Sequence, residues 1–156
     1  MKVAVAVVVC ALAVALPARA QSSVDVVALD GRRVAVTFDG MDRKTVITSD
    51  HGLKTTFEGV ALRDILARAG VPLGEALRGK ALARIIIATA TDGYQVAFAI
   101  AEVDAGFTDQ VILVADKRNG QPLLPDTGPL QIVVPLDKRA GRWIRQVTKL
   151  EVRDVR

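Results

Sequence analysis

The chain has 156 residues, 51% of them hydrophobic, and its 21 basic and 17 acidic residues give a formal net charge of +4. This length supports one domain with a real hydrophobic core but is short for two. So small a basic excess does not favour a nucleic-acid-binding protein, and the single cysteine, Cys10, excludes a disulfide within the chain.

Residues 1–20 have the pattern of a secretory signal peptide. After Lys2, an uninterrupted apolar run extends from Val3 to Leu16, which is shorter than the roughly 18 residues expected of a spanning helix. The small-x-small triplet that ends at Ala20 supplies a cleavage site. We therefore expect cleavage after this triplet and a periplasmic or secreted location. An uncleaved membrane anchor is the alternative.

Cleavage would leave residues 21–156 as a single domain. Lys2 and Arg19 would leave with the signal, so 19 basic residues would remain against 17 acidic ones, a formal charge of +2. Nucleic acid is therefore not an expected partner, and after cleavage neither is the membrane. Cys10 would leave as well, and an exported domain without disulfides depends on its hydrophobic core.

The first half of this domain predicts a hairpin, a third strand and one helix. Val24 to Leu29 and Val34 to Phe38 are β-branched segments around Asp30-Gly31, a dipeptide typical of a tight hairpin turn. Lys44 to Thr48 can form the third strand. The segment from Leu62 to Ala69 has apolar residues at three- and four-residue spacing, which indicates an amphipathic helix.

The second half of the domain is predicted to be mostly strands. Gly70 can end the helix in a left-handed cap, and the stretch 74–80 can add one further turn. Ala81 to Ala90 has the composition of a central strand covered on both faces. The other strands are expected over Tyr94 to Ile100, Val111 to Ala115, Leu130 to Val134 and Ile144 to Val152. Because most connections resemble hairpins, we predict an α+β fold with a mixed, largely antiparallel β-sheet and one or two short helices.

Several short motifs follow one another in a fixed order along the chain. They are Gly59-Val60-Ala61-Leu62, Asp92-Gly93-Tyr94, Asn119 to Leu123, Gly128-Pro129 to Pro135, and Arg142-Trp143. In this order and spacing, residues 57–152 resemble the oxidoreductase molybdopterin-binding domain, the fold of sulfite oxidase and its bacterial relatives. The specificity lies in the order and spacing, since each motif alone is a common turn or strand start.

The resemblance implies molybdopterin as a cofactor, but one family feature is missing. Relatives with the full catalytic domain hold molybdenum through a cysteine thiolate that precedes the helix, and this region contains no cysteine here. No serine or carboxylate has a motif match that entitles it to replace the thiolate, so we assign no metal ligand. The short upstream region also removes part of the wall that would enclose a pterin.

Four residues are candidate cofactor-binding residues: Tyr94, Lys138, Arg139 and Arg142. The three basic ones lie, with Arg145, within eight residues, and arginine can hold phosphate in a bidentate fork. In the family the equivalent region helps hold the pterin phosphate and the substrate anion, and the tyrosine motif implies a phenol at a strand-end pocket. The alternatives are a solvated turn for the basic residues and a half-buried aromatic for Tyr94.

The other polar residues predict no site of their own. His51 is the sole histidine, and a single histidine in an Asp-His-Gly turn does not make a metal site. Asp104, Asp109 and Asp116 lie on predicted connections, where caps and turns explain them. The sequence contains no Gly-rich phosphate loop, nucleophile elbow or metalloprotease helix.

These features favour an exported binding module for a small anion or a pterin-type ligand, without complete redox chemistry. One alternative is a truncated molybdopterin-dependent oxidoreductase subunit that a partner protein completes. The other is a periplasmic protein-interaction domain that binds another exported protein through an exposed strand edge or apolar patch.

Overall fold

A computed structural model describes residues 22–50 and 53–155 of the chain. The expected signal peptide and His51 lie outside these described residues. The strands are β1 (Ser23–Val27), β2 (Arg33–Thr37), β3 (Arg43–Asp50), β4 (Leu53–Ala61), β5 (Arg84–Ala90), β6 (Gln95–Ala99), β7 (Leu113–Arg118), β8 (Gln121–Pro122), β9 (Gln131–Val133) and β10 (Val147–Asp154). The helices are α1 (Leu62–Arg68) and the short 3-10 turns η1 (Gly74–Ala76), η2 (Gly79–Ala83), η3 (Ile100–Glu102) and η4 (Ala140–Arg142).

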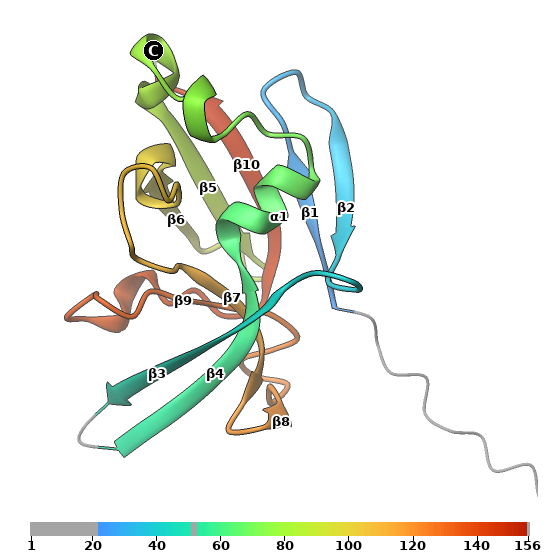
Figure 1. The fold of residues 1–156 in the computed structure, drawn as a ribbon. Coiled ribbons are helices and arrows are strands. Elements are labelled where there is room, and N and C mark those ends of the chain that lie inside the picture. The colour runs from blue at the N-terminus through green and yellow to red at the C-terminus, as the bar shows by residue number, and fades with distance from the viewer. Residues whose placement is uncertain (1–21, 51–52, 156) are drawn as a thin grey trace, which may run out of the picture.

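The strands form two sheets (Figure 1). The first has the order β2-β1-β10-β5-β6, and its β1–β10 pair is parallel while the other pairs are antiparallel. The second has the order β3-β4-β7-β8, with β9 also paired to β7, and all of these pairs are antiparallel. The α+β prediction with mixed, largely antiparallel strands is therefore confirmed, although the strands divide into two sheets.

The predicted hairpin and helix both form where the sequence indicates them. In the β1–β2 turn, Gly31 has a φ of +80° and the Asp30 carboxylate accepts a hydrogen bond from the Arg32 amide at 3.0 Å. Helix α1 ends before Gly70, whose φ is +79° and whose amide donates to the Ala67 carbonyl. Both turns thus use residues suited to their backbone angles.

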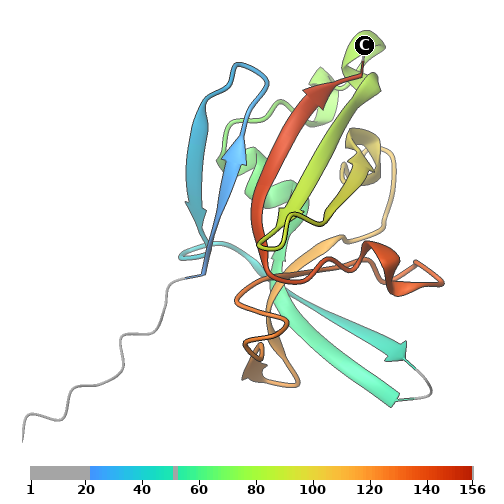
Figure 2. The same cartoon turned by 180° about the vertical axis from the view of Figure 1, so that it is seen from behind.

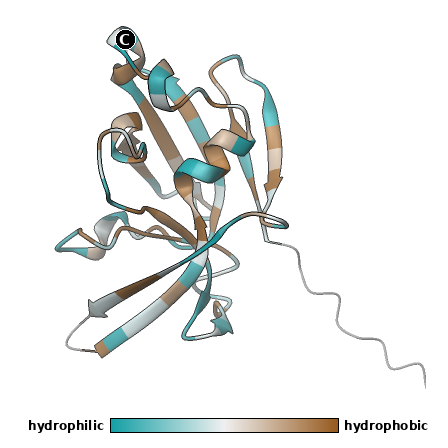
Figure 3. Ribbon diagram, viewed as in Figure 1, coloured by the Kyte–Doolittle hydropathy of each residue, from teal (hydrophilic) through white to brown (hydrophobic). Residues whose placement is uncertain are grey.

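The main core fills the space between the two sheets and helix α1. Inward-facing residues of the first sheet, such as Phe98 and Leu150, pack with Leu62 and Ile65 of the helix and with Ile132 of the second sheet. Figure 2, seen from behind, shows β1, β2, β10 and β5 in front of the helix. Strand β5 is largely hydrophobic (Figure 3), but its burial alternates, so only one of its faces is fully covered. The prediction of a strand covered on both faces was wrong on this point.

A smaller core lies on the opposite face of the second sheet. It contains Phe57, Leu113, Ala115 and Val133, and Trp143 packs against both this cluster and the main core. Successive residues of a strand point to opposite faces, so β7 and β9 can contribute to both cores. The tryptophan is therefore held at the junction of the two.

Strand β4 is the largest element that the sequence did not predict. It pairs with β3 along its whole length and with β7 over its second half, so it joins the outer hairpin to the rest of the second sheet. Figure 1 shows the β3–β4 hairpin extending away from the first sheet. Strand β5 also begins later than expected, at Arg84, because residues 79–83 form the 3-10 turn η2.

Asp104 is one of the few buried charged residues, with 2% of its surface exposed. Its carboxylate accepts hydrogen bonds from the amides of Gly74, at 2.7 Å, and Gly106, at 2.8 Å. These two bonds, the Gly74 bond first, lower the pKa of Asp104 below its ordinary value. The side chain therefore ties the segment after α1 to the loop after η3.

We predict that Asp104→Asn lowers the free energy of unfolding by about 1–3 kcal/mol at pH 7, because the new amide nitrogen cannot accept one of the two bonds. A lowered folded-state pKa gives stability that is present above the unfolded pKa, near 4, and lost as the pH falls through the folded value. Urea unfolding of both proteins should therefore show a difference at pH 7 that shrinks below pH 4. A difference that is equal at both pH values would contradict this assignment.

Candidate anion-binding site

Trp143 is fixed by its backbone, its indole nitrogen and its ring. The segment after η4 runs beside β9, where the Ile132 amide donates to the Ile144 carbonyl at 2.9 Å. The indole nitrogen donates to the Val134 carbonyl at 3.0 Å, and the ring meets Phe57 edge to face with centroids 5.9 Å apart. Trp143, which belongs to the segment 140–145, is therefore held as a wall against the β3–β4 hairpin.

A small cavity of about 120 Å³ lies on the hairpin side of this wall. We call it the threonine–arginine pocket, and its lining residues are Thr48, Thr55, Phe57, Arg118, Thr127, Gln131, Ala140, Trp143 and Arg145. Thr48 pairs with Thr55 across the β3–β4 hairpin, and Phe57 lies two residues further along β4, so these three side chains share one face of the sheet. The pairing of β3, β4, β7 and β9 thus brings Thr48, Thr55, Arg118 and Gln131 to one pocket.

The pocket combines buried polar groups with two arginines. Thr48 and Thr55 are 7% and 5% exposed, and the Thr48 hydroxyl has no hydrogen-bond partner among residues 22–50 and 53–155. Buried hydroxyl groups are nearly always paired with protein, water or a ligand, so this one is available to donate to a bound molecule. Arg118 and Arg145 make no ion pair within residues 22–50 and 53–155, and the lining contains no aspartate or glutamate. The pocket is therefore positively charged.

The Arg118 guanidinium is positioned by an aromatic ring. Its central carbon lies 5.7 Å from the centroid of Phe57, a geometry in which the cation is attracted to the ring face. Arg118 ends β7 opposite Phe57, so strand pairing sets this contact. One of the two cations is thus oriented before any ligand arrives.

A larger and more open hollow of about 420 Å³ also has Trp143 in its lining. We call it the tyrosine hollow, and it is lined by Ala90, Asp92, Tyr94, Asp126, Ala140, Gly141, Trp143, Ile144, Arg145 and Gln146. The Tyr94 hydroxyl donates to the Gly141 carbonyl at 3.0 Å, although 53% of the residue is exposed. Ala140, Trp143 and Arg145 line both cavities, so the two are neighbours.

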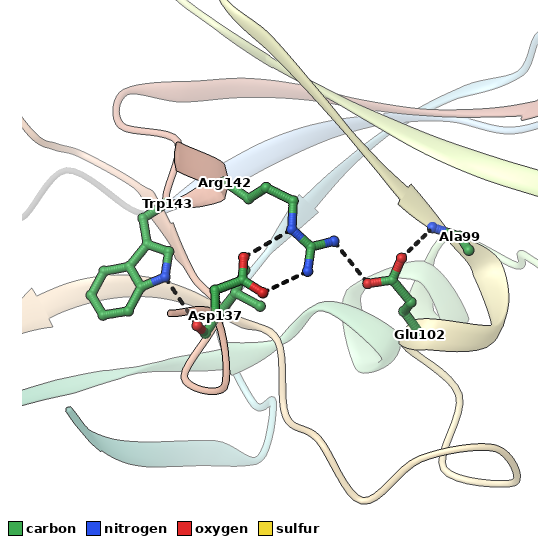
Figure 4. Close-up of polar contacts among 6 residues, drawn as sticks. Ala99, Glu102, Asp137, Arg142 and Trp143 are labelled. Carbon is green, nitrogen blue, oxygen red and sulfur yellow. Dashed lines mark hydrogen bonds and ion pairs between the residues drawn. The ribbon is translucent and has the colours of Figure 1, made fainter. Parts of the chain in front are cut away.

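Arg142 lines neither of these two cavities. Its guanidinium donates to both oxygens of Asp137, at 2.8 and 2.7 Å, and to Glu102 at 2.8 Å (Figure 4). It also lies over the Phe98 ring, 5.2 Å from the centroid. Hydrogen bonds to Asp137 and then Glu102 raise the pKa of Arg142 above its ordinary value. The donors of this arginine are thus largely occupied by the protein itself.

The four predicted cofactor-binding residues are therefore not brought together at one cavity. Tyr94 lines the tyrosine hollow, Arg142 points toward η3, and Lys138 and Arg139 are exposed on the turn before η4 and line neither cavity. Whether any of the four contacts a cofactor stays a prediction.

The other acidic candidates serve mainly in structural contacts. Asp116 forms an ion pair with Arg43 and accepts a bond from Ser22 at 3.2 Å. Asp109 lines a separate hollow of about 190 Å³, together with Arg63. Across the part of the chain that the structure describes, no three His, Cys, Asp or Glu side chains come close enough to hold a metal ion.

The sequence did not reveal Thr48, Thr55, Arg118 or Gln131 as site residues. They come from four strands, and only the pairing of β4 with β3 and of β7 with β4 and β9 brings them together. A usable signal existed in the alternation of Thr55 and Phe57, which marks the buried face of an unpredicted strand.

The family model for the oxidoreductase molybdopterin binding domain matches residues 21–156, a longer span than the motifs alone cover. No curated protein matches the chain. None of the described helices is both long enough and apolar enough to cross a membrane.

Proposed function

The chain belongs to the oxidoreductase molybdopterin-binding domain family, and from this premise we propose that it is an exported module that binds a small anion. The observation that carries the proposal is the Thr48 hydroxyl, which is buried in a pocket with two arginines and, within the part of the chain that the structure describes, has neither a hydrogen-bond partner nor a carboxylate in the same lining. An anionic oxygen in the pocket would accept from the hydroxyl and balance the positive charge.

The family's metal–pterin group does not fit the described residues. Molybdenum in the full catalytic relatives requires a thiolate, and residues 22–155 contain no cysteine. The threonine–arginine pocket, at about 120 Å³, is well below the roughly 300–1,000 Å³ that encloses drug-sized ligands. The tyrosine hollow is larger, but Asp92 and Asp126 in its lining would repel a pterin phosphate. Complete redox chemistry by this chain alone is therefore not part of the proposal.

Export is part of the proposal and rests on the sequence pattern of residues 1–20. Mass spectrometry of the protein secreted by its own host would test it. We expect a mature N-terminus at Gln21, and a full-length chain retained in the membrane fraction would contradict export.

Binding of an anion should raise the melting temperature of the mature protein. A ligand that binds only the folded state adds stability that reaches about 2.7 kcal/mol at one hundred times its dissociation constant. We expect inorganic phosphate or sulfate, at concentrations too low for general salt stabilisation, to raise the melting temperature along a binding curve that chloride at equal ionic strength does not give. Equal melting temperatures in all three salts would contradict an anion-binding function.

The same preparation tests the enzyme alternative, a truncated oxidoreductase subunit that a partner completes. The family match over residues 21–156 favours it. Stoichiometric molybdenum together with dye-linked oxidase or reductase activity would establish it. Metal-free protein from molybdenum-replete cells would count against it.

The interaction-domain alternative is favoured by the β3–β4 hairpin. Ile47 and Leu53 are 66% and 74% exposed on its two opposite faces, and β3 ends the second sheet. An exposed edge strand with apolar side chains can pair with another chain. A secreted protein that purifies as a monomer without a bound partner would count against this alternative.

A further inference from the structure

We propose that the threonine–arginine pocket is a site for one small tetrahedral oxyanion, and that the Thr48 hydroxyl donates a hydrogen bond to it. This inference rests on the proposed function and deepens it by naming the pocket, its donors and the class of ligand. None of its central residues, Thr48, Arg118 and Arg145, belongs to the four residues that the sequence singled out.

The volume of the pocket limits the size of the ligand. A cavity of about 150 Å³ holds a molecule the size of benzene, with six heavy atoms. The pocket here measures about 120 Å³. An oxyanion with five heavy atoms, such as phosphate or sulfate, fits that space, whereas a pterin with its side chain and phosphate does not.

The two arginines determine the charge and shape of the ligand. Arg118 comes from the end of β7 and Arg145 from the segment after η4, so they reach the pocket from different parts of the fold. Each guanidinium offers parallel donors that match two oxygens of a tetrahedral oxyanion. Planar carboxylates offer two oxygens in total and can satisfy one such fork, so we expect tetrahedral ions to bind more tightly.

The threonines and the glutamine supply neutral donors at the buried end of the site. Thr48 and Thr55 face each other across the hairpin, and Gln131, 7% exposed, lies on β9 in the same lining. Leaving a buried hydroxyl unpaired is unfavourable, because the group has lost its hydrogen bonds to water without gaining a partner. An oxygen of the bound ligand would accept a hydrogen bond from the Thr48 hydroxyl. Pairing of this hydroxyl therefore contributes to the binding free energy of the ligand.

Replacing Thr48 with valine separates this role from a purely structural one. Valine has the same shape without the hydroxyl, so Thr48→Val should leave the free protein as stable as the parent or more stable. The same change should weaken phosphate and sulfate binding about tenfold, the loss of one hydrogen bond to a charged ligand. Isothermal titration calorimetry on the mature protein measures the affinity, and urea unfolding measures the stability.

The arginines have matched controls in the exposed turn. Arg118→Gln and Arg145→Gln should each weaken binding of either oxyanion at least about tenfold, whereas Lys138→Gln and Arg139→Gln should change it less than about twofold. The four variants lose the same charge, so a general electrostatic effect would weaken all of them alike. Acetate and chloride serve as the ions of the wrong shape.

Each outcome decides the inference. Binding that survives in Thr48→Val, Arg118→Gln and Arg145→Gln would place the anion elsewhere and overturn the inference, while the proposed function would stand. Equal losses in the Lys138 and Arg139 variants, or acetate that binds as tightly as phosphate, would overturn it as well. A parent protein that no anion stabilises or binds would overturn both the inference and the proposed function.

Discussion

The Gly59→Ala variant is expected to lose more than about 4 kcal/mol of its free energy of unfolding. A Cβ atom at residue 59 would lie 2.1 Å from the carbonyl oxygen of Val114 and 2.6 Å from the Cα of Ala115. Both are backbone atoms of β7, so they can move only if the β4–β7 pair opens. The register of this pair shifts between Glu58 and Gly59, which brings the two backbones together at this point.

Gly141→Ala is the matched control for this substitution. No atom lies within 4 Å of a Cβ built at Gly141, and the residue lacks a positive φ, so its stability should stay within about 1 kcal/mol of the parent. Urea unfolding followed by circular dichroism compares the two variants. A Gly59→Ala protein as stable as Gly141→Ala would show that the β4–β7 contact is not as close as the structure has it.

The Arg142→Met variant is expected to lose about 2–3 kcal/mol of stability at pH 7 without losing anion affinity. The substitution keeps most of the side-chain length but removes every hydrogen bond to Asp137 and Glu102. Glu102 also accepts from the Ala99 amide at 3.1 Å, so the arginine braces the start of η3 as well as its own turn. Two half-buried carboxylates would remain without their shared cation.

Arg139→Met tests whether this loss reflects charge alone. Arg139 is exposed and has no hydrogen bond or ion pair to a described residue, so its replacement should change stability by less than about 0.5 kcal/mol. Calorimetry with phosphate should give similar affinities for both variants and the parent. An Arg142→Met protein that is fully stable but no longer binds phosphate would restore Arg142 as a ligand-binding residue.

The fold could be predicted from local patterns wherever the signal was itself local. The Asp30-Gly31 turn and the helix that Gly70 ends depend on residues within a few positions of each other. Strand β4 was not predicted because its first half contains the polar residues Lys54, Thr55 and Thr56 and therefore lacks the apolar pattern of a strand. Its buried face becomes evident only when β3 is placed beside it.

The site was harder to predict because its charges are distributed by contacts distant in sequence. Four basic residues lie within 138–145, but the sequence does not say which of them the protein uses internally. The Arg142 guanidinium donates a hydrogen bond to Glu102, which lies 40 residues earlier in the sequence. Arg145, in contrast, lines both cavities. The family resemblance correctly identified the domain, but its site residues could not be transferred without this information.

Trp143 connects the fold to the proposed function. Its indole nitrogen donates to the Val134 carbonyl and its ring packs against Phe57, so the position of this side chain, which lines both cavities, is set by the core and not by a ligand. The threonine–arginine pocket is therefore formed in advance, which lowers the cost of ordering a site when an ion binds.

Crystals of the mature protein soaked in selenate test the central claim most directly. Selenate is a tetrahedral oxyanion, and anomalous scattering from selenium locates it without ambiguity. We predict one selenium position between Arg118 and Arg145, with an oxygen within hydrogen-bonding distance of the Thr48 hydroxyl. Selenium beside Tyr94 or Arg139, with the threonine–arginine pocket empty, would contradict it.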